Sequence, residues 1–280
     1  MISVLIVTKN EAQDLPGCLE SVRWCDDVHV YDSFSTDDTV AIARAFGAHV
    51  TEHVEGDRGL AFGGDEAAHR NWGLHNLPFR HEWVLQLDAD ERVPAVLVEE
   101  MTRAVQGSPH AAFQIRRRDF LASTWLRHVQ ATPYYLRLFR PRCLRFERLI
   151  NSVSIVDGSI GKLNGYFDHF PFSKGISHWI AKHNHYSTLE ARQIADNRRL
   201  GARFSVVKAF TAKEFHERRY HQKELFYRLG ARPLFKFFIL FFVKRGFLDG
   251  RAGFTYAMLQ SMYEYMIVLK SRELERVVKN

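Results

Sequence analysis

Two carboxylates separated by one residue follow an apolar, strand-like run in this chain. The run is Trp83-Val-Leu-Gln-Leu, and Asp88, Asp90 and Glu91 come directly after it. Residues two apart in an extended backbone point to the same side, so both aspartates can approach one ligand. Hard divalent cations prefer carboxylate oxygens and substrate phosphates. The pattern predicts a site for a metal and a diphosphate, against the simpler alternative of an acidic turn that caps the next helix.

The segments that must position this pair alternate between strand and helix patterns. Short apolar, β-branched runs predict strands, and apolar residues at helical spacing between them predict helices. The helix expected at 36–46 has Ser35, Thr36 or Asp37 as its N-cap candidate and Gly47 at its end. The expected elements are strands at 1–7, 28–31, 48–52 and 83–87 and helices at 11–22, 36–46 and 65–76. Strands that alternate with short helices favour an α/β fold with a mainly parallel, helix-covered sheet.

Polar residues follow three of the predicted strands. The first is followed by Thr8-Lys-Asn-Glu11, the second by Asp32 and a turn rich in Ser and Thr, and the fourth by Asp88-Ala-Asp90. Ligands of such sheets bind beyond the carboxyl ends of the strands. The chain has neither G-x-G-x-x-G nor G-x-x-x-x-G-K-[ST], the glycine-rich motifs that hold phosphates. A diphosphate at this rim would therefore be neutralised by a metal ion.

The carboxyl-terminal region carries the whole basic excess of the chain. Residues 201–280 hold 16 Lys and Arg against 7 Asp and Glu, whereas residues 1–200 hold 23 against 25. We therefore expect two domains, 1–200 with the sheet and 201–280 as a helical extension. One helix is expected at 251–270, and an earlier one is marked by apolar residues at helical spacing, namely Leu234, Phe237, Phe238, Phe241 and Phe242. Contact with an anionic membrane surface and packing on a second copy of the chain both stay open.

The composition of the chain limits which partners and which cellular compartment we expect. Aromatic residues of the basic region form apolar blocks and not separate stacking positions, so we expect no nucleic-acid partner. Three cysteines without a C-x-x-C pair fit a reduced compartment. The amino terminus lacks the basic segment and the cleavage site of a secretory signal. We expect a cytoplasmic protein, peripheral on the inner face of the cytoplasmic membrane if the basic region binds lipid.

Taken together, these motifs resemble the family 2 glycosyltransferases, which have the GT-A type nucleotide-sugar fold. The resemblance includes Ile6-Val-Thr-Lys-Asn-Glu11, the Asp32–Thr39 turn, Arg70-Asn71 and the aspartate pair. Within the family, the chain is most similar to bacterial lipopolysaccharide-core and exopolysaccharide glucosyltransferases. The segments that carry this likeness are 136–140, 156–158, 183–191 and 246–250.

The resemblance implies roles for the residues of the rim. Asp90 is expected to bind Mg²⁺ or Mn²⁺ directly, while Asp88 faces the ribose or a metal-bound water. His169 is either a metal or phosphate contact or a satisfied core histidine. Residues expected to hold the nucleotide sugar are Thr8, Asn10 and Glu11 at base and ribose, Asp32 at the base, Arg70 and Asn71 near the diphosphate or base, and Asp88.

Transfer with inversion also requires a base that takes the proton of the acceptor hydroxyl. Members of this group usually offer a His-Glu pair where this chain reads Arg148-Leu-Ile-Asn-Ser152, so both members of the pair are missing. Asp157 is our first candidate, and Glu147 and Asp119 are the alternatives.

The expected function is a metal-dependent, inverting transfer from a nucleotide-diphosphate sugar, UDP-linked, to a lipid-linked, lipopolysaccharide or exopolysaccharide acceptor. Two alternatives stay open: a protein or peptide glycosyltransferase with the same donor site, and a catalytically silent scaffold that binds nucleotide sugars.

Overall fold

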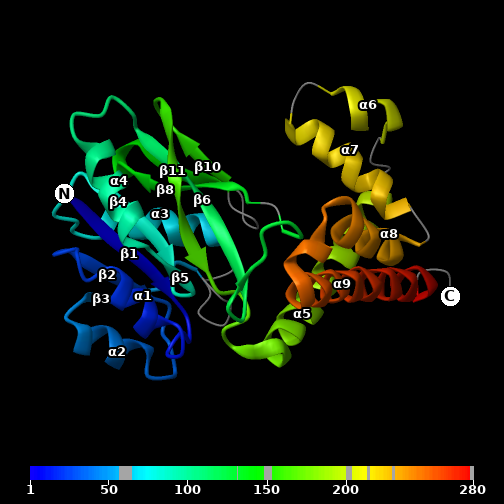
Figure 1. Ribbon diagram of the computed structural model, residues 1–280, viewed down its shortest axis with the longest axis horizontal. Coiled ribbons are helices and arrows are strands. Elements are labelled where there is room, and N and C mark those ends of the chain that lie inside the picture. The colour runs from blue at the N-terminus through cyan, green and yellow to red at the C-terminus, as the bar shows by residue number, and fades with distance from the viewer. Residues whose placement is uncertain are drawn as a thin grey trace. The chain divides into compact units, whose positions relative to one another are not determined.

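The computed structural model describes residues 1–56, 65–130, 132–147, 153–199, 204–212, 215–228 and 231–277, which form two compact units (Figure 1). The first unit comprises Met1–Ala122 and Thr132–Lys174, and the second comprises Ser123–Ala131 and Gly175–Asn280. The two units divide after Lys174, whereas the sequence led us to expect the end of the first domain at residue 200. Helix α5 (Gly175–Arg199) accounts for the difference, because it belongs to the second unit.

The first unit is built on one mixed sheet in which strands follow the order β3-β2-β1-β4-β8-β6-β11-β5. A separate antiparallel pair consists of β9 (Leu144–Glu147) and β10 (Val153–Val156). The bounds of the sheet strands are β1 Ile2–Thr8, β2 Val28–Asp32, β3 His49–Glu52, β4 Trp83–Asp88, β5 Glu91–Arg92, β6 Ala112–Leu121, β8 Tyr134–Phe139 and β11 Ile160–His169.

Strands β1, β2, β3 and β4 are parallel, which confirms the parallel part of the predicted sheet. Strand β1 lies between β2 and β4, with Thr8 opposite Asp32 and Val7 opposite Asp88. The carboxyl ends of three strands therefore lie side by side. This register brings the three polar segments found in the sequence to one edge of the sheet.

Helices cover both faces of this sheet because the apolar side chains of β1 alternate in direction. Val4 and Ile6 pack with residues of α1 (Leu15–Ser21), α2 (Thr39–Phe46) and α4 (Ala95–Val105). Leu5 and Val7 pack on the other face with Leu74 of α3, which spans Glu66–Asn76. A buried, helix-covered parallel sheet with continuous apolar strands is the expected α/β arrangement.

Helices α1 and α2 begin three or four residues later than the sequence pattern predicted. The residues in front of them form two interlocked turns instead. The backbone N–H of Asn10 donates to Ser35 Oγ at 2.8 Å, and that of Thr36 donates to Asn10 Oδ1 at 2.8 Å. Helix α2 has Asp38 as its N-cap, outside the three candidates, and ends as expected at Gly47, which has a φ of 91°.

The second unit is helical. Helix α8 ends at Phe238, and a π-helical turn, Ile239–Val243, carries the expected helical segment onward. The remaining elements are β7 Thr124–Trp125, α6 Val206–Thr211, α7 Phe215–Arg228, α8 Arg232–Phe238, a 3₁₀ turn Gly246–Asp249 and α9 Gly250–Val277. No helix within the described ranges is both long and apolar enough to cross a membrane.

Candidate active site

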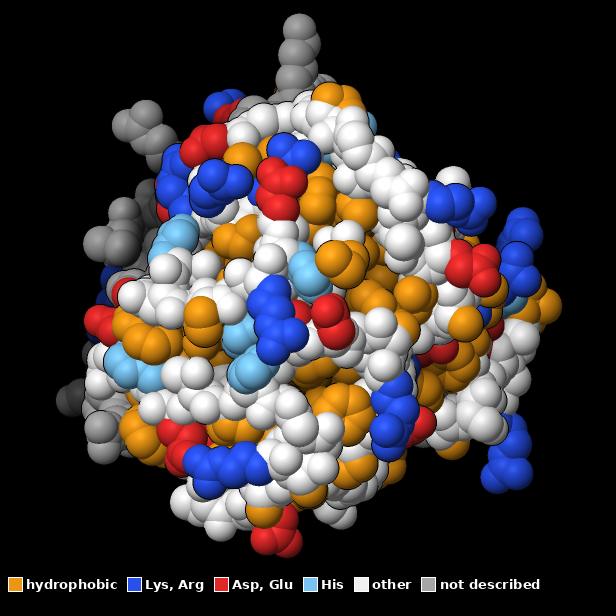
Figure 2. Space-filling view, turned by 90° about the vertical axis from the view of Figure 1, so that its left-hand side faces the viewer, with side chains coloured by type: hydrophobic (Ala, Val, Ile, Leu, Met, Phe, Trp, Pro, Cys, Tyr) orange, Lys and Arg blue, Asp and Glu red, His pale blue; other side chains and the backbone are white. Residues whose placement is uncertain are grey.

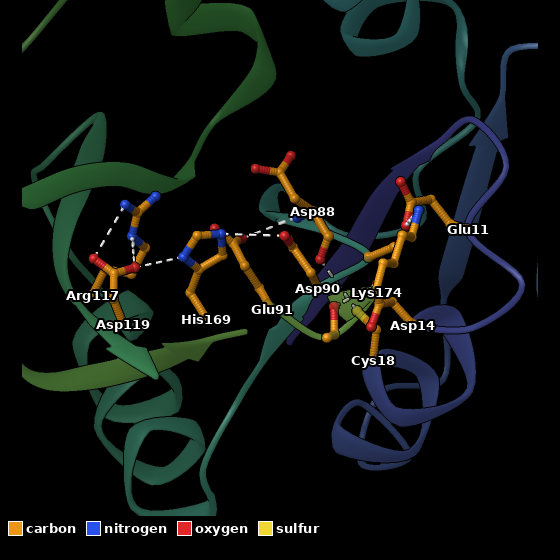
Figure 3. A network of polar contacts seen from close by, with 12 residues as sticks. Glu11, Asp14, Cys18, Asp88, Asp90, Glu91, Arg117, Asp119, His169 and Lys174 are labelled. Carbon is orange, nitrogen blue, oxygen red and sulfur yellow. Dashed lines mark hydrogen bonds and ion pairs between the residues drawn. The ribbon is translucent and has the colours of Figure 1, made fainter. Parts of the chain in front are cut away.

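Asp88 and Asp90 lie where β4 gives way to β5. Asp88 is the last residue of β4, and Asp90 lies in the turn before Glu91, the first residue of β5. Their carboxylates face different partners, although one residue separates them. Figure 3 shows Asp90 turned toward the ring of His169. The Asp88 carboxylate instead accepts a hydrogen bond from Arg137.

The Asp88 carboxylate has two cationic neighbours. Arg137 Nη2 on β8 donates to its Oδ2 at 2.8 Å, and Arg70 Nη2 on α3 lies 4.0 Å from its Oδ1. Burial alone would raise the pKa of Asp88, but Arg137 and then Arg70 outweigh it and hold the pKa well below its ordinary value. Asp88 is therefore ionised, with positive charge already beside it.

Arg137 also binds Glu91, and thereby ties together both ends of the acidic turn. The same Nη2 donates to Glu91 Oε1 at 2.5 Å, while Glu91 Oε2 accepts the backbone N–H of Asp88 at 3.0 Å. Glu91 is fully buried, which raises its pKa above the ordinary value although Arg137 opposes this. The contacts of Glu91 with Arg137 and with the backbone of Asp88 thus fix the turn that carries Asp88 and Asp90.

The Asp90 carboxylate begins a chain of polar contacts that ends at Arg117 (Figure 3). His169 Nε2 lies 3.2 Å from Asp90 Oδ2, and its Nδ1 lies 2.5 Å from Asp119 Oδ1. Arg117 Nε lies 2.9 Å from the same Asp119 oxygen. Burial lowers the pKa of His169, but the hydrogen bonds to Asp119 and Asp90 outweigh it and raise the pKa to about 9. His169 is therefore a cation at neutral pH and donates to both carboxylates.

The two aspartates can hold a divalent cation only with ligands from elsewhere. Among the residues that the structure describes, no group of three or more His, Cys, Asp and Glu side chains is placed to hold a metal ion. Carboxylates such as Asp88 and Asp90 suit Mg²⁺ or Mn²⁺, which commonly fill their remaining positions with water and substrate phosphates. The donor set therefore fits a cation that binds together with a diphosphate.

Thr8 and Asp32 meet at the ends of β1 and β2. Asp32 is fully buried, and its Oδ1 accepts Thr8 Oγ1 at 2.8 Å. The same carboxylate accepts the hydroxyl of Ser35 at 2.5 Å and its backbone N–H at 2.6 Å. The structure brings together two residues predicted to contact the nucleotide, and it occupies the Asp32 carboxylate in holding the turn after β2.

Asn10 and Glu11 share a cation that the sequence analysis did not identify. Lys174 Nζ lies 2.7 Å from Glu11 Oε2 and donates to the backbone oxygen of Asn10 at 2.9 Å. Burial raises the pKa of Glu11, and Lys174 partly offsets this. No local pattern could have indicated Lys174, because it follows β11 and reaches this rim only through the fold.

Arg70 and Asn71 are neighbours on α3 but have different surroundings. Arg70 points to the acidic turn, with its Nε donating to Glu66 at 3.0 Å and its guanidinium 5.6 Å from the centre of the Phe146 ring. The Asn71 side chain donates to the backbone oxygen of Phe146 at 2.9 Å and accepts its N–H at 2.7 Å. Arg70 thus lies near Asp88, whereas Asn71 fastens β9 to α3.

The three candidates for the acceptor base lie in two places. Asp157 and Glu147 are exposed and share Arg145, at 3.2 Å and 3.1 Å. Asp119 is buried and contacts the ring of His169, whose other nitrogen faces Asp90. The Arg148–Ser152 segment, where the His-Glu pair was expected, lies outside the described residues.

Comparison with known proteins gives consistent matches. A family model described as Glycosyl transferase family 2 matches residues 3–166. The chain is 26% identical to an uncharacterized glycosyltransferase of Rickettsia typhi, over 100% of this chain and 89% of that protein. It is 24% identical to the lipopolysaccharide core biosynthesis glycosyltransferase LpsC of Rhizobium meliloti, over 96% of this chain and 91% of that protein.

Among solved structures, the chain is similar to a mannosyltransferase of Pyrobaculum calidifontis in complex with GDP-Man and Mn²⁺. The TM-score is 0.53 and the identity 14%, over 96% of this chain and 86% of the other. This likeness concerns the fold, and the GT-A type fold expected from the sequence is confirmed. The family match begins in β1, includes both aspartates and ends within β11. The chain therefore belongs to glycosyl transferase family 2 and is a glycosyltransferase.

Proposed function

We propose that the enzyme transfers a sugar from a nucleotide-diphosphate sugar to a lipid-linked, lipopolysaccharide or exopolysaccharide acceptor, with inversion at the sugar carbon and with a divalent metal ion. The observation that carries the proposal is the position of Asp88 and Asp90 at the end of β4, beside the ends of β1 and β2. Ligands of parallel sheets bind at this edge.

Two arginines lie beside Asp88 and can donate hydrogen bonds to a diphosphate. Arg70 and Arg137 both approach Asp88 from the protein side. Arg137 also pairs with Glu91, and Arg70 also pairs with Glu66. The two guanidinium groups therefore offer a diphosphate hydrogen-bond donors, while the surplus of positive charge would come from the metal ion. Guanidinium groups also present several donors in a planar fork, which suits phosphate oxygens.

A divalent cation held by Asp90 and Asp88, when bound, would act as a Lewis acid on the departing diphosphate. Asp90 is proposed as the direct ligand, because it has one cationic neighbour, His169, whereas Asp88 has two guanidinium groups beside it. His169 would hold Asp90 in place before binding, and Asp119 would orient the ring of His169. Either Mg²⁺ or Mn²⁺ suits these carboxylates.

The acceptor base is proposed to be Asp157, with Glu147 and Asp119 as alternatives. Asp157 has 73% of its side chain exposed and can therefore meet an acceptor hydroxyl, whereas Asp119 is buried. Replacing a general base costs roughly a hundredfold or more in kcat. Comparing Asp157→Asn, Glu147→Gln and Asp119→Asn under saturating donor would identify which carboxylate takes the proton.

The acceptor class is proposed from the likeness to LpsC, which is named for lipopolysaccharide core biosynthesis. A protein or peptide acceptor would use the same donor site, and a silent scaffold would bind donor without turnover. Incubation with a nucleotide sugar separates these readings: transfer to a glycolipid supports the proposal, transfer to protein favours the first alternative, and binding without transfer favours the second.

The deciding experiment is a calorimetric titration of UDP, GDP and dTDP, with and without Mn²⁺. The resemblance implies UDP, whereas the similar mannosyltransferase holds GDP-Man, so the comparison includes both. Asp90→Ala should abolish the metal-dependent binding. Asp26→Ala is the matched control, because this exposed carboxylate precedes β2 at the opposite edge of the sheet. Failure of the wild-type protein to bind any of these nucleotides would overturn the proposed donor site.

A further inference from the structure

Helices α8 and α9 expose large apolar side chains that a water-soluble surface rarely shows. We define the α8–α9 surface by Leu234, Phe238, Phe242, Phe254, Met262 and Tyr265, whose exposed fractions lie between 48% and 72%. On α9, the exposed positions 254, 258, 262, 265 and 269 recur every three or four residues. They therefore form one stripe along the helix.

These side chains form a continuous surface across the two helices. Leu234 of α8 lines the same hollow of about 450 Å³ as Met262 and Tyr265 of α9. The ring of Phe254 lies 5.8 Å from that of Phe237 and 5.7 Å from that of Phe241. The apolar stripe of α9 is thus joined to α8 and to the π-helical turn that follows it.

The exposed charges are positive along residues 231–272, and the last turn of α9 adds exposed Glu273 and Glu275 beside exposed Arg276. Between residues 231 and 272 the carboxylates are Asp249 and Glu264, and both are buried. Asp249 accepts the backbone N–H and contacts the ring of His128, and Glu264 lies 3.7 Å from Arg232. The exposed charged residues of this segment are Lys244, Arg245, Arg251 and Arg272.

This distribution differs from that on the sheet-containing part of the molecule. Figure 2 shows a face on which acidic and basic side chains are interspersed between small hydrophobic areas. Mixed charges of this kind are ordinary for a surface in water. A surface that joins exposed aromatic residues to charges of one sign indicates a partner that is apolar and anionic together.

We propose that the α8–α9 surface docks on an anionic lipid membrane, with its aromatic and methionine side chains at the level of the acyl-chain boundary and its cations on the lipid phosphates. Lysine and arginine near such a membrane are attracted by its negative surface potential. The contact is peripheral, because no described helix is suited to span a bilayer.

A second copy of the chain fits this surface less well. In a two-fold symmetric dimer the same patch meets itself. Lys244, Arg245 and Arg251 would then meet the same basic patch of the second copy, and the exposed carboxylates Glu273 and Glu275 lie at the far end of α9 from Arg251. Like charges brought together at an interface are unfavourable, whereas anionic lipid neutralises them. Docking on a membrane would also bring the enzyme close to a lipid-linked acceptor. This consequence rests on the proposed function, whereas the docking itself does not.

The test is flotation of the full chain with vesicles of phosphatidylcholine, alone or with added phosphatidylglycerol. We expect binding to the anionic vesicles, weakened by salt. Lys244→Glu with Arg251→Glu should reduce binding at least about tenfold, given the attraction per cation near anionic lipid. Phe238→Ser with Phe242→Ser should also release the protein.

The matched control is Val206→Ser with Val207→Ser, which removes two exposed apolar side chains from α6, outside the surface. This variant should bind as the wild type does. Equal binding to neutral and anionic vesicles, no binding to either, or binding unchanged in both surface variants would overturn the proposal. A different result would assign the surface to a second copy of the chain. In that case the wild-type protein would be a dimer that does not bind vesicles, and Phe238→Ser with Phe242→Ser would dissociate the dimer. Nucleotide titration of the same variants tests the donor site separately.

Discussion

Arg137 Nη2 lies 2.8 Å from Asp88 Oδ2, although 49 residues separate the two in the sequence. The same nitrogen contacts Glu91, so one guanidinium is shared by both carboxylates that flank the acidic turn. Asp90, between them, instead faces His169. The two aspartates that look equivalent in the sequence therefore have different electrostatic surroundings, and substitutions at them should have different effects.

Removing Arg137 should destabilise the first unit. Arg137→Ala leaves the fully buried Glu91 without its cation, and breaking a buried pair in this way costs about 3 kcal/mol or more. Urea unfolding measures the loss. Glu91→Gln in the same background should restore part of it, because it removes the uncompensated charge. Arg145→Ala is the control, since that exposed arginine should leave unfolding unchanged. If the losses of unfolding free energy caused by the Arg137 and Glu91 substitutions were strictly additive, the two residues would not interact as an ion pair.

Asp90→Asn should impair catalysis more than Asp88→Asn. Asp90 is the proposed direct metal ligand, and Lewis-acid stabilisation is worth several kcal/mol, so kcat should fall at least about a thousandfold. Asp88→Asn should cost less, because Arg137 and Arg70 remain to meet the diphosphate. Initial rates across a series of Mn²⁺ concentrations would separate the two. If Asp88→Asn instead raised the Mn²⁺ concentration needed for activity more than Asp90→Asn did, Asp88 would be the direct metal ligand.

The sequence was sufficient to place polar residues at the carboxyl edge of the sheet, because the patterns that mark a strand and its end are local. An apolar β-branched run identifies β1 or β4, and the polar residue that follows marks the strand end. Thr8, Asp32 and Asp88 consequently lie where the pattern predicted. The helix starts were misplaced because Asn10 and Thr36 bond each other across two turns, and periodicity does not register such a contact.

The partners of the polar side chains were beyond sequence reasoning. Asn71 stays predicted to lie near the nucleotide, and the structure adds that its amide hydrogen-bonds the backbone of Phe146, which is 75 residues away. Arg137 sits in an apolar strand, and only the folded sheet shows that its charge meets Asp88. Side-chain partners depend on which strands become neighbours, so the choice of an acceptor base also stays a prediction.

His69 should make stability depend on pH between about 4 and 6.5. It is fully buried on α3 beside the hydroxyls of Tyr31 and Ser33, and burial lowers its pKa to about 4. The unfolded chain binds a proton below about 6.5 and the folded protein does not, so stability is full above that pH and falls as the pH drops.

The difference should reach about 3 kcal/mol at pH 4 and is measured by urea unfolding at several pH values. His69→Gln retains hydrogen-bonding groups but cannot titrate, and its stability should fall less over this range. His75→Gln, an exposed position on the same helix, should behave as the wild type. Parallel pH profiles for the wild type and His69→Gln would show that another group causes the acid sensitivity.

Gly253→Ala should destabilise the second unit, because α9 passes directly against the preceding turn at this position. A Cβ on Gly253 would lie 2.0 Å from the backbone oxygen of Gly246 and 2.9 Å from Asp249 Cβ. Backbone cannot move aside as a flexible side chain can, and overpacking of this kind costs about 1–3 kcal/mol.

Hydrogen exchange of Gly253→Ala should show faster opening of α9, with unchanged protection of β1. Thr255→Ala, exposed on the same helix, should leave both unaffected. Because Asp249 also holds His128 by a hydrogen bond of 2.6 Å, displacement of the turn should expose that half-buried histidine further. Unaltered exchange in α9 would mean that the turn and the helix separate without cost.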